Sequence, residues 1–360
     1  MTSPLFPPPS AAPLNALYDV PAPAKLNLFL HVVGKRPDGY HLLQSLFVLV
    51  DWADTLHFER RADGALHRHD RGDALPADDL CLRAARALQQ ASGCAHGVDI
   101  HIDKRLPSGA GMGGGSSDAA STLLALNRLW GLNWSRERLL PIALKLGADV
   151  PFFVGGRNAF VEGIGEILRP VDVPALRLAV IKPAVSIGTK EIFSSPLLQR
   201  SESVAIVAGF PAANDGRDAD NSKPATAASF LETEIDSSGG REGNMHRDRQ
   251  TPEILVQQLY EGWGRNDLQP PAQAASHEVS TALEWLQTRY GNSRMTGSGS
   301  AVFARVQPSL ITAQETDTVT DPGSNPEATP DGRLNELPPG WVGRMCRSLA
   351  VHPLRGWADD

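Results

Sequence analysis

The chain has 360 residues, 41% of them hydrophobic and 21% charged, which is the composition of an ordinary soluble globular enzyme and allows two domains. Its formal net charge of −7 argues against a nucleic-acid partner, because proteins that bind polyanions usually carry a basic face. The three cysteines, Cys81, Cys94 and Cys346, are too scattered for a disulfide framework or a zinc site, so a reducing cytoplasm is expected. No run of about 18 apolar residues predicts a membrane span.

The chain is expected to open with an irregular tail followed by a β-hairpin. Residues 1–23 are rich in proline and alanine and lack the basic residues of a targeting peptide. Residues 24–33 and 44–54 are rich in apolar and β-branched residues, as in buried strands. Between them, residues 36–39 read Arg-Pro-Asp-Gly, a turn sequence in which proline presets φ and glycine accepts a positive φ.

Helices and strands then follow one another up to about residue 184. Asp78 or Asp79 should cap a helix that runs to about residue 91, and Ser135 should open another that ends near Gly147. A helix is also expected over 116–130, where apolar residues recur at helical spacing. The remaining expected elements are strands at 98–102 and 176–184, and a strand interrupted by glycines at 159–168.

The boundary between the two domains is expected near residues 170–174, which gives domains over 20–172 and 175–356. Two stretches, 214–250 and 315–337, are polar and almost without periodic apolar residues. Because such segments bury too little surface to offset chain entropy, they are predicted to be disordered insertions in the second domain.

The strongest local signal is a glycine-rich loop between an expected strand and an expected helix. Residues 106–118 read Leu-Pro-Ser-Gly-Ala-Gly-Met-Gly-Gly-Gly-Ser-Ser-Asp. Glycines let the backbone approach an anion closely, and the N-terminus of the following helix adds a partial positive charge. The pattern therefore favours a phosphate-binding loop. The alternative is a flexible connector in which Ser or Asp only caps the helix, but that would leave the backbone cost of so many glycines unexplained.

Three known kinds of phosphate loop fit poorly. A P-loop needs a Lys-Ser or Lys-Thr pair after its last glycine, and none follows here. Gly109, Gly111 and Gly114 match the dinucleotide-binding fingerprint literally, but that motif requires a second strand after the helix, where this sequence predicts another helix. The His-Arg-Asp and Asp-Phe-Gly triplets of protein kinases are absent.

Three motifs together resemble the GHMP kinase family, named after galactokinase, homoserine kinase, mevalonate kinase and phosphomevalonate kinase. They occur in the family's order: Pro-Ala-Lys-Leu-Asn-Leu at 23–28, the glycine loop at 107–117, and Thr-Gly-Ser-Gly-Ser-Ala-Val-Phe at 296–303. The resemblance implies a two-domain α+β fold. The N-terminal domain would be ribosomal-protein-like and bind ATP, the C-terminal domain would be ferredoxin-like, and the active site would lie in the cleft between them.

Two further segments are similar to one branch of this family, which acts on 4-diphosphocytidyl-2-C-methyl-D-erythritol. They read Arg-Pro-Asp-Gly-Tyr-His at 36–41 and Gly-Ala-Asp-Val-Pro-Phe at 147–152. This resemblance implies that the chain phosphorylates the 2-hydroxyl of that cytidine-diphosphate-linked methylerythritol in the non-mevalonate isoprenoid pathway. ATP and Mg²⁺ would be the cofactors, and the small-molecule substrate the partner.

Other functions stay open at this stage. A homoserine or mevalonate kinase is disfavoured by the Asp-Gly-Tyr-His segment, because those substrates have no base to stack. A non-catalytic nucleotide-binding protein is disfavoured by Lys25 and Asp149, which both match the family's catalytic pattern. A dehydrogenase would bind NADH and would not hydrolyse ATP.

The resemblance assigns the catalytic and nucleotide-binding roles. Asp149, which on bare sequence would be a turn or cap residue, would be the general base, and Lys25 beside it would keep the carboxylate ionised. Asp79, where an Asn is usual in the family, and Lys104 would border the adenine, and Ser117 is the candidate magnesium ligand. The residues expected at the ATP phosphates are Pro107, Ser108, Gly109, Ala110, Gly111, Met112, Gly113, Gly114, Gly115, Ser116 and Ser117.

The substrate side is assigned in the same way. The resemblance implies that Tyr40 stacks on the cytosine, that Phe193 supplies a second stacking face and that His41 hydrogen-bonds the polar edge of the base. Asn27 and Thr189 would contact the diphosphate or the polyol.

Overall fold

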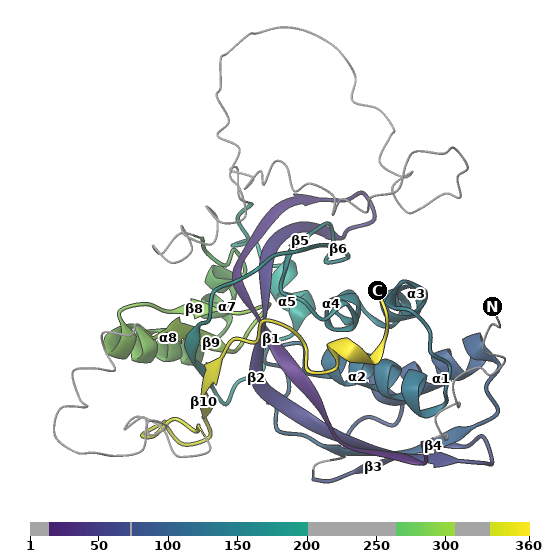
Figure 1. The fold of residues 1–360 in the computed structure, drawn as a ribbon. Helices are drawn as coiled ribbons and strands as arrows, with labels where there is room; N and C mark the ends of the chain where they lie inside the picture. The colour runs from purple at the N-terminus through teal and green to yellow at the C-terminus, as the bar shows by residue number, and fades with distance from the viewer. Residues whose placement is uncertain (1–13, 73, 201–263, 307–331) are drawn as a thin grey trace, which may run out of the picture.

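The computed structural model describes residues 14–72, 74–200, 264–306 and 332–360 (Figure 1). Two β-sheets form its centre, and helices flank both of them, so the α+β class predicted from the sequence is confirmed. No helix in these ranges is long and apolar enough to cross a membrane. The predicted insertion at 214–250, and the part of 315–337 that precedes residue 332, lie outside the described residues. For residues 332–337 the prediction of disorder is wrong, because Leu334 is buried and its backbone N–H donates to the carbonyl of Gly343 at 3.1 Å.

The first sheet is built on a long hairpin of β1 (Ala16–Lys35) and β2 (His41–Arg61). The hairpin was predicted, with its turn at Gly39, whose φ is +91°. Both strands extend beyond the predicted limits. The prediction of an irregular tail up to residue 23 is wrong for residues 16–23, because Val20 is buried against the helices and pairs with Leu56 of β2.

Four shorter strands complete the first sheet. They are β3 (Leu66–Asp70), β4 (Gly97–Asp103), β5 (Ala159–Glu162) and β6 (Ile167–Pro170), in the spatial order β3-β4-β2-β5-β6, with β1 paired to β2. Only the β3–β4 pairing within it is parallel. A strand interrupted by glycines was predicted over 159–168, and the structure has two separate strands there. The chain turns back at Gly163 and Gly165, whose φ values of +72° and +120° suit a turn, to form the β5–β6 hairpin.

Four helices cover one face of this sheet: α1 (Leu80–Ser92), α2 (Gly114–Leu129), α3 (Arg136–Leu146) and α4 (Val150–Gly155). The predicted caps are confirmed. The side chain of Asp79 accepts a hydrogen bond from the backbone N–H of Leu82, and that of Ser135 accepts one from Arg138. Nearly all of α2 is buried, because it packs against β1, α1 and α4 at once.

The second sheet is antiparallel, in the order β10-β7-β9-β8. Its strands are β7 (Arg177–Lys182), β8 (Arg294–Met295), β9 (Val302–Arg305) and β10 (Val342–Arg347). The predicted strand at 176–184 is β7. The accompanying helices are α5 (Thr189–Phe193), α7 (Gln269–Ala275) and α8 (His277–Tyr290).

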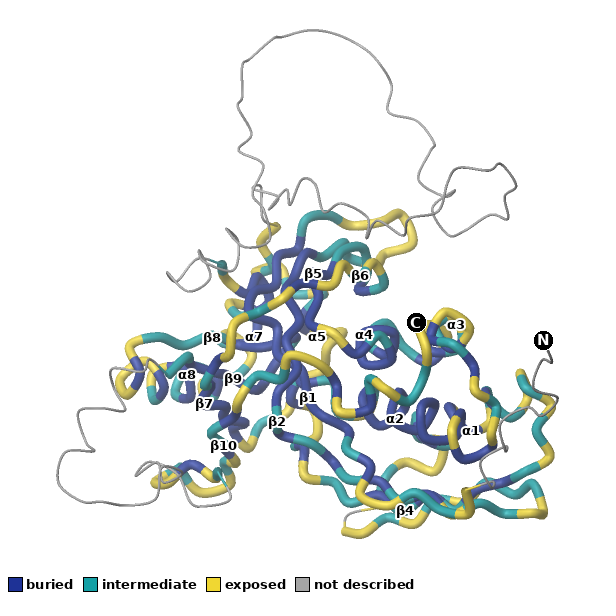
Figure 2. Tube along the Cα trace, viewed as in Figure 1, coloured by how far each residue is buried: buried dark blue, intermediate teal, exposed yellow. Residues whose placement is uncertain are grey.

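The elements stack in four layers, with three apolar clusters between them (Figure 2). One cluster joins α1–α4 to the first sheet, one lies between the two sheets, and one joins the second sheet to α7 and α8. The chain passes from the first sheet to the second between Pro170 and Arg177, where we propose the domain boundary. Its last residues, which include the short 3₁₀ helix η2 (Arg355–Trp357), return to pack beside α2 (Figure 1).

Candidate active site

Two cavities meet at the glycine loop. The first, here called the loop cavity, has a volume of about 390 Å³ and is lined by Leu75, Pro76, residues 78–80, Lys104, residues 106–115 and Asp118. The second, here called the Lys25 cavity, measures about 480 Å³, and its lining includes Lys25, Asn27, Tyr40, His41, Asp149, Thr189 and Phe193. Gly111 and Gly113 line both cavities. A ligand that fills the loop cavity therefore ends next to a ligand in the Lys25 cavity.

The conformation of the loop explains its glycines. Gly109, Gly111 and Gly113 have φ values of +63°, +73° and +74°, which residues with a side chain rarely adopt. A Cβ atom at Gly111 would lie 2.6 Å from the carbonyl oxygen of Thr296. Gly113 is also the N-cap of α2, so the loop leads directly into the N-terminus of a helix. This is the arrangement predicted for a phosphate-binding loop.

The third sequence motif packs against this loop. The backbone N–H of Ser300 donates to the carbonyl of Gly109 at 3.3 Å, and that of Ala301 donates to Ala110 at 3.2 Å. A Cβ atom at Gly297 would lie 2.6 Å from the carbonyl oxygen of Gly111. The two glycine-rich turns, one from each half of the chain, therefore pack directly against each other and are joined by backbone hydrogen bonds.

Lys25 and Asp149, predicted as catalytic residues, lie side by side, with 3.5 Å between Nζ and Oδ2. The side chain of Lys25 is 4% exposed, whereas that of Asp149 is 30% exposed. Asp149 is the N-cap residue of α4, but its carboxylate makes no capping hydrogen bond. The carboxylate is thus open to the cavity and can accept a proton from a ligand there.

The ammonium of Lys25 is held by two further groups. It donates a hydrogen bond of 2.7 Å to Oδ1 of Asn27, and it lies 4.2 Å from the centre of the Phe47 ring. Oδ1 of Asn27 also accepts the backbone N–H of Gly297 at 3.0 Å, and its Nδ2 donates to Ser45 at 2.8 Å. Most of the hydrogen-bonding capacity of Asn27, predicted to contact the substrate, is therefore used within the protein.

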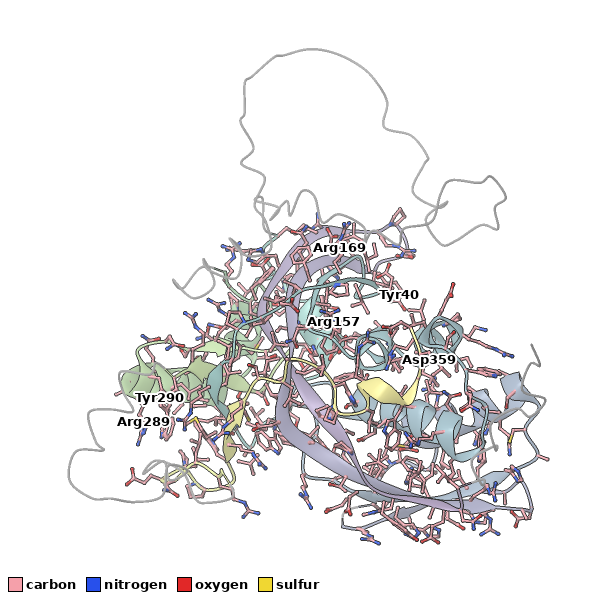
Figure 3. The ribbon with its side chains drawn as sticks, viewed as in Figure 1. Tyr40, Arg157, Arg169, Arg289, Tyr290 and Asp359 are labelled. Atoms are coloured by element: carbon pink, nitrogen blue, oxygen red, sulfur yellow. The ribbon has the colours of Figure 1, made fainter. Side chains whose placement is uncertain are left out.

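The predicted base-binding residues lie at the outer end of the Lys25 cavity. Tyr40 is on the β1–β2 turn and is 61% exposed (Figure 3). The rings of His41 and Phe193 stack on each other, with centroids 5.1 Å apart and an angle of 26° between their planes. This contact was not foreseen from the sequence. Thr189, the first residue of α5, lines the same cavity, and its hydroxyl oxygen is 2.8 Å from that of Ser298.

The imidazole of His41 is biased toward its neutral form. Partial burial lowers its pKa, and the positive charges of Lys35 and Arg200 lower it further. A neutral imidazole has one donor and one acceptor nitrogen. His41 can therefore offer both kinds of hydrogen bond to the edge of a base.

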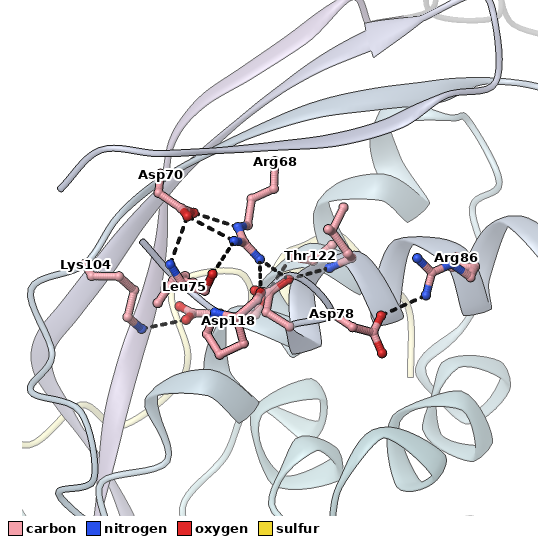
Figure 4. A network of polar contacts seen from close by, with 11 residues as sticks. Arg68, Asp70, Leu75, Asp78, Arg86, Lys104, Asp118 and Thr122 are labelled. Atoms are coloured by element: carbon pink, nitrogen blue, oxygen red, sulfur yellow. Dashed lines mark hydrogen bonds and ion pairs between the residues drawn. The ribbon is translucent and has the colours of Figure 1, made fainter. Parts of the chain in front are cut away.

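On the other side of the loop, Asp79 is held by an arginine that sequence reasoning missed. Arg68 of β3 is 2.8 Å from Asp79, makes two hydrogen bonds to Asp70 and donates to the backbone carbonyls of Leu75 and Pro76 (Figure 4). These contacts fix the wall of the loop cavity over residues 75–79. The available sequence signal was the Arg-x-Asp pair on a strand, which places both side chains on one face.

Lys104 lies between two buried carboxylates. Its Nζ atom donates to Asp118 at 2.6 Å and forms an ion pair with Asp54 (Figure 4 shows Lys104 and Asp118). Burial, and after it the charge of Asp54, raise the pKa of Asp118 to about 8 against the opposing effect of Lys104. Asp54 and Asp118 were not predicted as site residues, because nothing in the sequence brings residues 54, 104 and 118 together.

Ser116 and Ser117 are the two predicted phosphate-loop residues that line neither cavity. The side chain of Ser117 is fully buried, and its hydroxyl donates to the carbonyl of Pro23 at 2.6 Å. The structure therefore does not bring the predicted magnesium ligand to the shared wall, the part of the glycine loop at Gly111 and Gly113 that lines both cavities. Over the described ranges, no group of three or more His, Cys, Asp or Glu side chains is placed to hold a metal ion.

Comparison with known proteins identifies this architecture. The family model of the GHMP kinases N terminal domain matches residues 79–157, and that of the GHMP kinases C terminal domain matches residues 243–315. Two relatives are described as 4-diphosphocytidyl-2-C-methyl-D-erythritol kinase. The one from Methylibium petroleiphilum is 56% identical over 96% of this chain and 99% of its own length. The one from Verminephrobacter eiseniae is 49% identical, with the same two coverages.

Solved structures agree with the sequence comparison. A crystal structure of 4-(cytidine 5'-diphospho)-2C-methyl-D-erythritol kinase is 30% identical, with a TM-score of 0.57, and the match covers 81% of this chain and 92% of that one. A homoserine kinase from Cytophaga hutchinsonii shares the fold at 16% identity and a TM-score of 0.52, over 86% of this chain and 90% of its own. The chain therefore belongs to the GHMP kinase family and, within it, to the 4-diphosphocytidyl-2-C-methyl-D-erythritol kinases.

Proposed function

We propose that this protein transfers the γ-phosphoryl group of ATP to the 2-hydroxyl of 4-diphosphocytidyl-2-C-methyl-D-erythritol, giving ADP and the 2-phosphate. The observation that carries the proposal is that the Lys25–Asp149 pair opens into a cavity that also holds Tyr40, His41 and Phe193. That cavity shares Gly111 and Gly113 with the loop cavity, which has the form of a phosphate site. Relatives at 49% and 56% identity carry the name of this kinase.

The two cavities suggest how the reactants are placed. ATP occupies the loop cavity, with its phosphates against the backbone N–H groups of the loop and the N-terminus of α2. The γ-phosphate then lies at the shared wall, and the acceptor hydroxyl approaches it from the Lys25 cavity. Phosphoryl transfer depends mainly on such positioning and on charge neutralisation.

The chemical step needs one proton acceptor. The substrate oxygen attacks the γ-phosphorus, the bond from that phosphorus to the ADP oxygen breaks, and the hydroxyl proton passes to a carboxylate oxygen of Asp149. Lys25 places a positive charge beside that carboxylate and stabilises negative charge on the transferred group. The exposed carboxylate and the buried ammonium at 3.5 Å support these two roles.

Magnesium is the metal that the family implies. The described residues offer no cage of protein ligands, and the hydroxyl of Ser117 is directed at Pro23. This donor set fits a magnesium ion that keeps several waters and is bound mainly by the phosphates of ATP, and Asp149 is the carboxylate that lines the Lys25 cavity. When bound, the ion would neutralise phosphate charge.

The base-binding end of the Lys25 cavity distinguishes this substrate from the smaller acceptors of the family. The exposed ring of Tyr40 and the His41–Phe193 stack offer aromatic faces and hydrogen-bonding groups suited to cytosine. Homoserine and mevalonate have no base to use them. We further propose that the reaction is a step of non-mevalonate isoprenoid synthesis in the cytoplasm, where the three cysteines, all free, would stay reduced.

ADP release tests the proposal. The purified protein would be assayed with ATP, Mg²⁺ and the cytidyl-methylerythritol substrate, with homoserine and mevalonate in parallel, and phosphorus NMR would identify the new phosphomonoester. Turnover with the cytidyl substrate alone is expected. Turnover with mevalonate or homoserine instead would overturn the substrate assignment, and ATP binding without turnover on any acceptor would favour a non-catalytic protein.

A further inference from the structure

Lys104 lies at the point where the loop cavity meets the N-terminus of α2. A Cβ atom at Gly114, the first residue of α2, would be 3.6 Å from Nζ of Lys104. The ammonium is in contact with Asp54 and Asp118, whose side chains are almost completely buried, while Lys104 itself is 21% exposed. The lysine therefore faces the cavity with both carboxylates behind it.

Asp54 also fixes the start of the loop. Its Oδ1 atom accepts the backbone N–H groups of Arg105 and Leu106 at 2.6 and 2.7 Å, and its Oδ2 atom pairs with Lys104. Asp118 lies on α2, immediately after the two serines that end the glycine loop. The three side chains thus join β2, the segment that follows β4, and α2 at one place.

The hydrogen-bonding capacity of Lys104 leads to the inference. An ammonium group has three N–H donors and no acceptor. Two of them are taken by Asp54 and Asp118, so their positions fix the direction of the third. A lysine held in this way acts as a directed hydrogen-bond donor, whereas a solvated lysine is a mobile point charge.

We propose that Asp118 and Asp54 are positioning residues that aim the third N–H of Lys104 at a hydrogen-bond acceptor of the nucleotide bound in the loop cavity. This inference rests on the proposed function, since it takes the nucleotide to be ATP or ADP. It assigns roles to two residues that the reaction itself does not use. The acceptor is a nitrogen of the base or an oxygen of the ribose or phosphates.

The affinity for ADP, measured by calorimetry without acceptor substrate, tests the inference. Asp118→Ala is expected to weaken ADP binding on the order of ten-fold, because Lys104 loses one of its two fixed partners. Asp118→Asn, which keeps an oxygen to accept from Lys104, is expected to recover most of that loss. Asp99→Asn is the matched control. Asp99 is also an ion-paired aspartate at the first sheet, 2.8 Å from Arg61, but it lines neither cavity.

A double-mutant cycle shows whether Asp118 acts through Lys104. Lys104→Met is expected to weaken ADP binding, and adding Asp118→Ala to it should weaken binding no further. An equal loss from Asp118→Ala in both backgrounds would overturn the inference. So would an equal rise in KM for ATP and for the acceptor, which would indicate general loosening of the fold.

Lys104→Arg keeps the experiment decisive if Asp118→Ala fails to fold. Arginine retains the charge, but its longer planar head cannot occupy the same position between the two carboxylates. Weakened ADP binding is expected, and wild-type affinity would contradict the inference because charge alone would then suffice. Wild-type protein that binds ADP and turns over the cytidyl substrate separates this outcome from failure of the proposed function itself.

Discussion

At the level of single residues, the chemistry depends on how the side chain of Asp149 is held. The residue is the N-cap of a short helix, where a carboxylate would ordinarily accept a backbone N–H, yet it makes no such bond. Its nearest cation, Lys25, is buried and hydrogen-bonded to Asn27. The carboxylate is left accessible and without a backbone partner, as the proposed general base requires.

Replacing this carboxylate removes the proton acceptor without removing the phosphate site. Asp149→Asn is expected to lower kcat by roughly 10²–10⁴-fold. Binding of ADP, measured by calorimetry, should stay within a few-fold of wild type because Asp149 does not line the loop cavity. A variant with near-normal kcat would exclude Asp149 as the base.

Tyr40 tests the recognition of the base. Tyr40→Ala is expected to raise KM for the cytidyl substrate by roughly 5–150-fold, the equivalent of about 1–3 kcal/mol of stacking, with KM for ATP little changed. Tyr18→Ala is a matched control, since Tyr18 is equally exposed at 61% but lies on β1 away from both cavities. Equal changes in KM for both substrates would rule out the stacking role.

Asp118 makes stability depend on pH in an unusual direction. Its pKa is raised from 3.8 to about 8 in the folded protein, so between these values the folded state holds a proton that the unfolded state has released. The free energy of unfolding should therefore fall as pH rises from 4 to 8, by at most about 1.4 kcal/mol per pH unit. Asp118→Asn removes this titration.

The measurement is the difference in Tm between Asp118→Asn and wild type. The Tm of the variant minus that of the wild type should increase from pH 5 to pH 8 and stay constant above pH 8. A difference independent of pH would show that Asp118 is ionised throughout.

At the level of elements, the wall of the loop cavity depends on a contact between β3 and the segment before α1. Arg68 joins Asp70 on its own strand to Asp79 and to the carbonyls of Leu75 and Pro76. A guanidinium can make these contacts at once because its donors lie in a fixed planar fork. A lysine carries the same charge, but its single ammonium group cannot reach all of these acceptors at once.

Arg68→Lys should therefore loosen the segment over 75–79. KM for ATP is expected to rise several-fold, whereas KM for the cytidyl substrate stays the same, because residues 75–79 line only the loop cavity. Arg61→Lys serves as control, since Arg61 also makes paired contacts with an aspartate two residues away but lines neither cavity. Unchanged KM for ATP in the Arg68 variant would contradict this role.

At the level of the whole molecule, residues 355–360 return to the helices that flank Asp149, the proposed base. The buried guanidinium of Arg136, at the start of α3, donates to the carbonyl of Val154 at the end of α4 and to that of Ala358. Arg355 donates to the carbonyl of Gly155. These bonds satisfy carbonyls that a helix C-terminus leaves unpaired, and so they hold the short helix that begins after Asp149.

Arg136→Gln tests whether these hydrogen bonds to the end of α4 affect stability, catalysis or both. The free energy of unfolding is expected to fall by roughly 2–4 kcal/mol, because buried carbonyls and Asp360 lose a charged donor. At temperatures below the lowered Tm, kcat should fall by a larger factor than the factor by which KM for ATP changes. A loss of stability with kcat unchanged would show that α4 holds Asp149 without help from the end of the chain.

The sequence alone was enough for what local patterns determine. The hairpin turn at Gly39, the caps Asp79 and Ser135, and the glycine loop before α2 all follow from residue types in fixed short-range order. The family motifs were equally recognisable, because each is a short continuous segment, such as Gly-Ala-Asp-Val-Pro-Phe at 147–152. Element ends were less certain, as the longer β1 and the β5–β6 hairpin show, since pairing partners decide where a strand stops.

Only the tertiary structure decided which distant side chains meet. Residues 54, 104 and 118 form one charged cluster, residues 41 and 193 stack, and the turns at 111 and 297 interlock, although long stretches of chain separate each set. The hydroxyl of Ser117 points at Pro23, although the motif alone placed it at the phosphates. Such contacts depend on how strands and helices pack, and packing is a property of the whole chain that no short segment specifies.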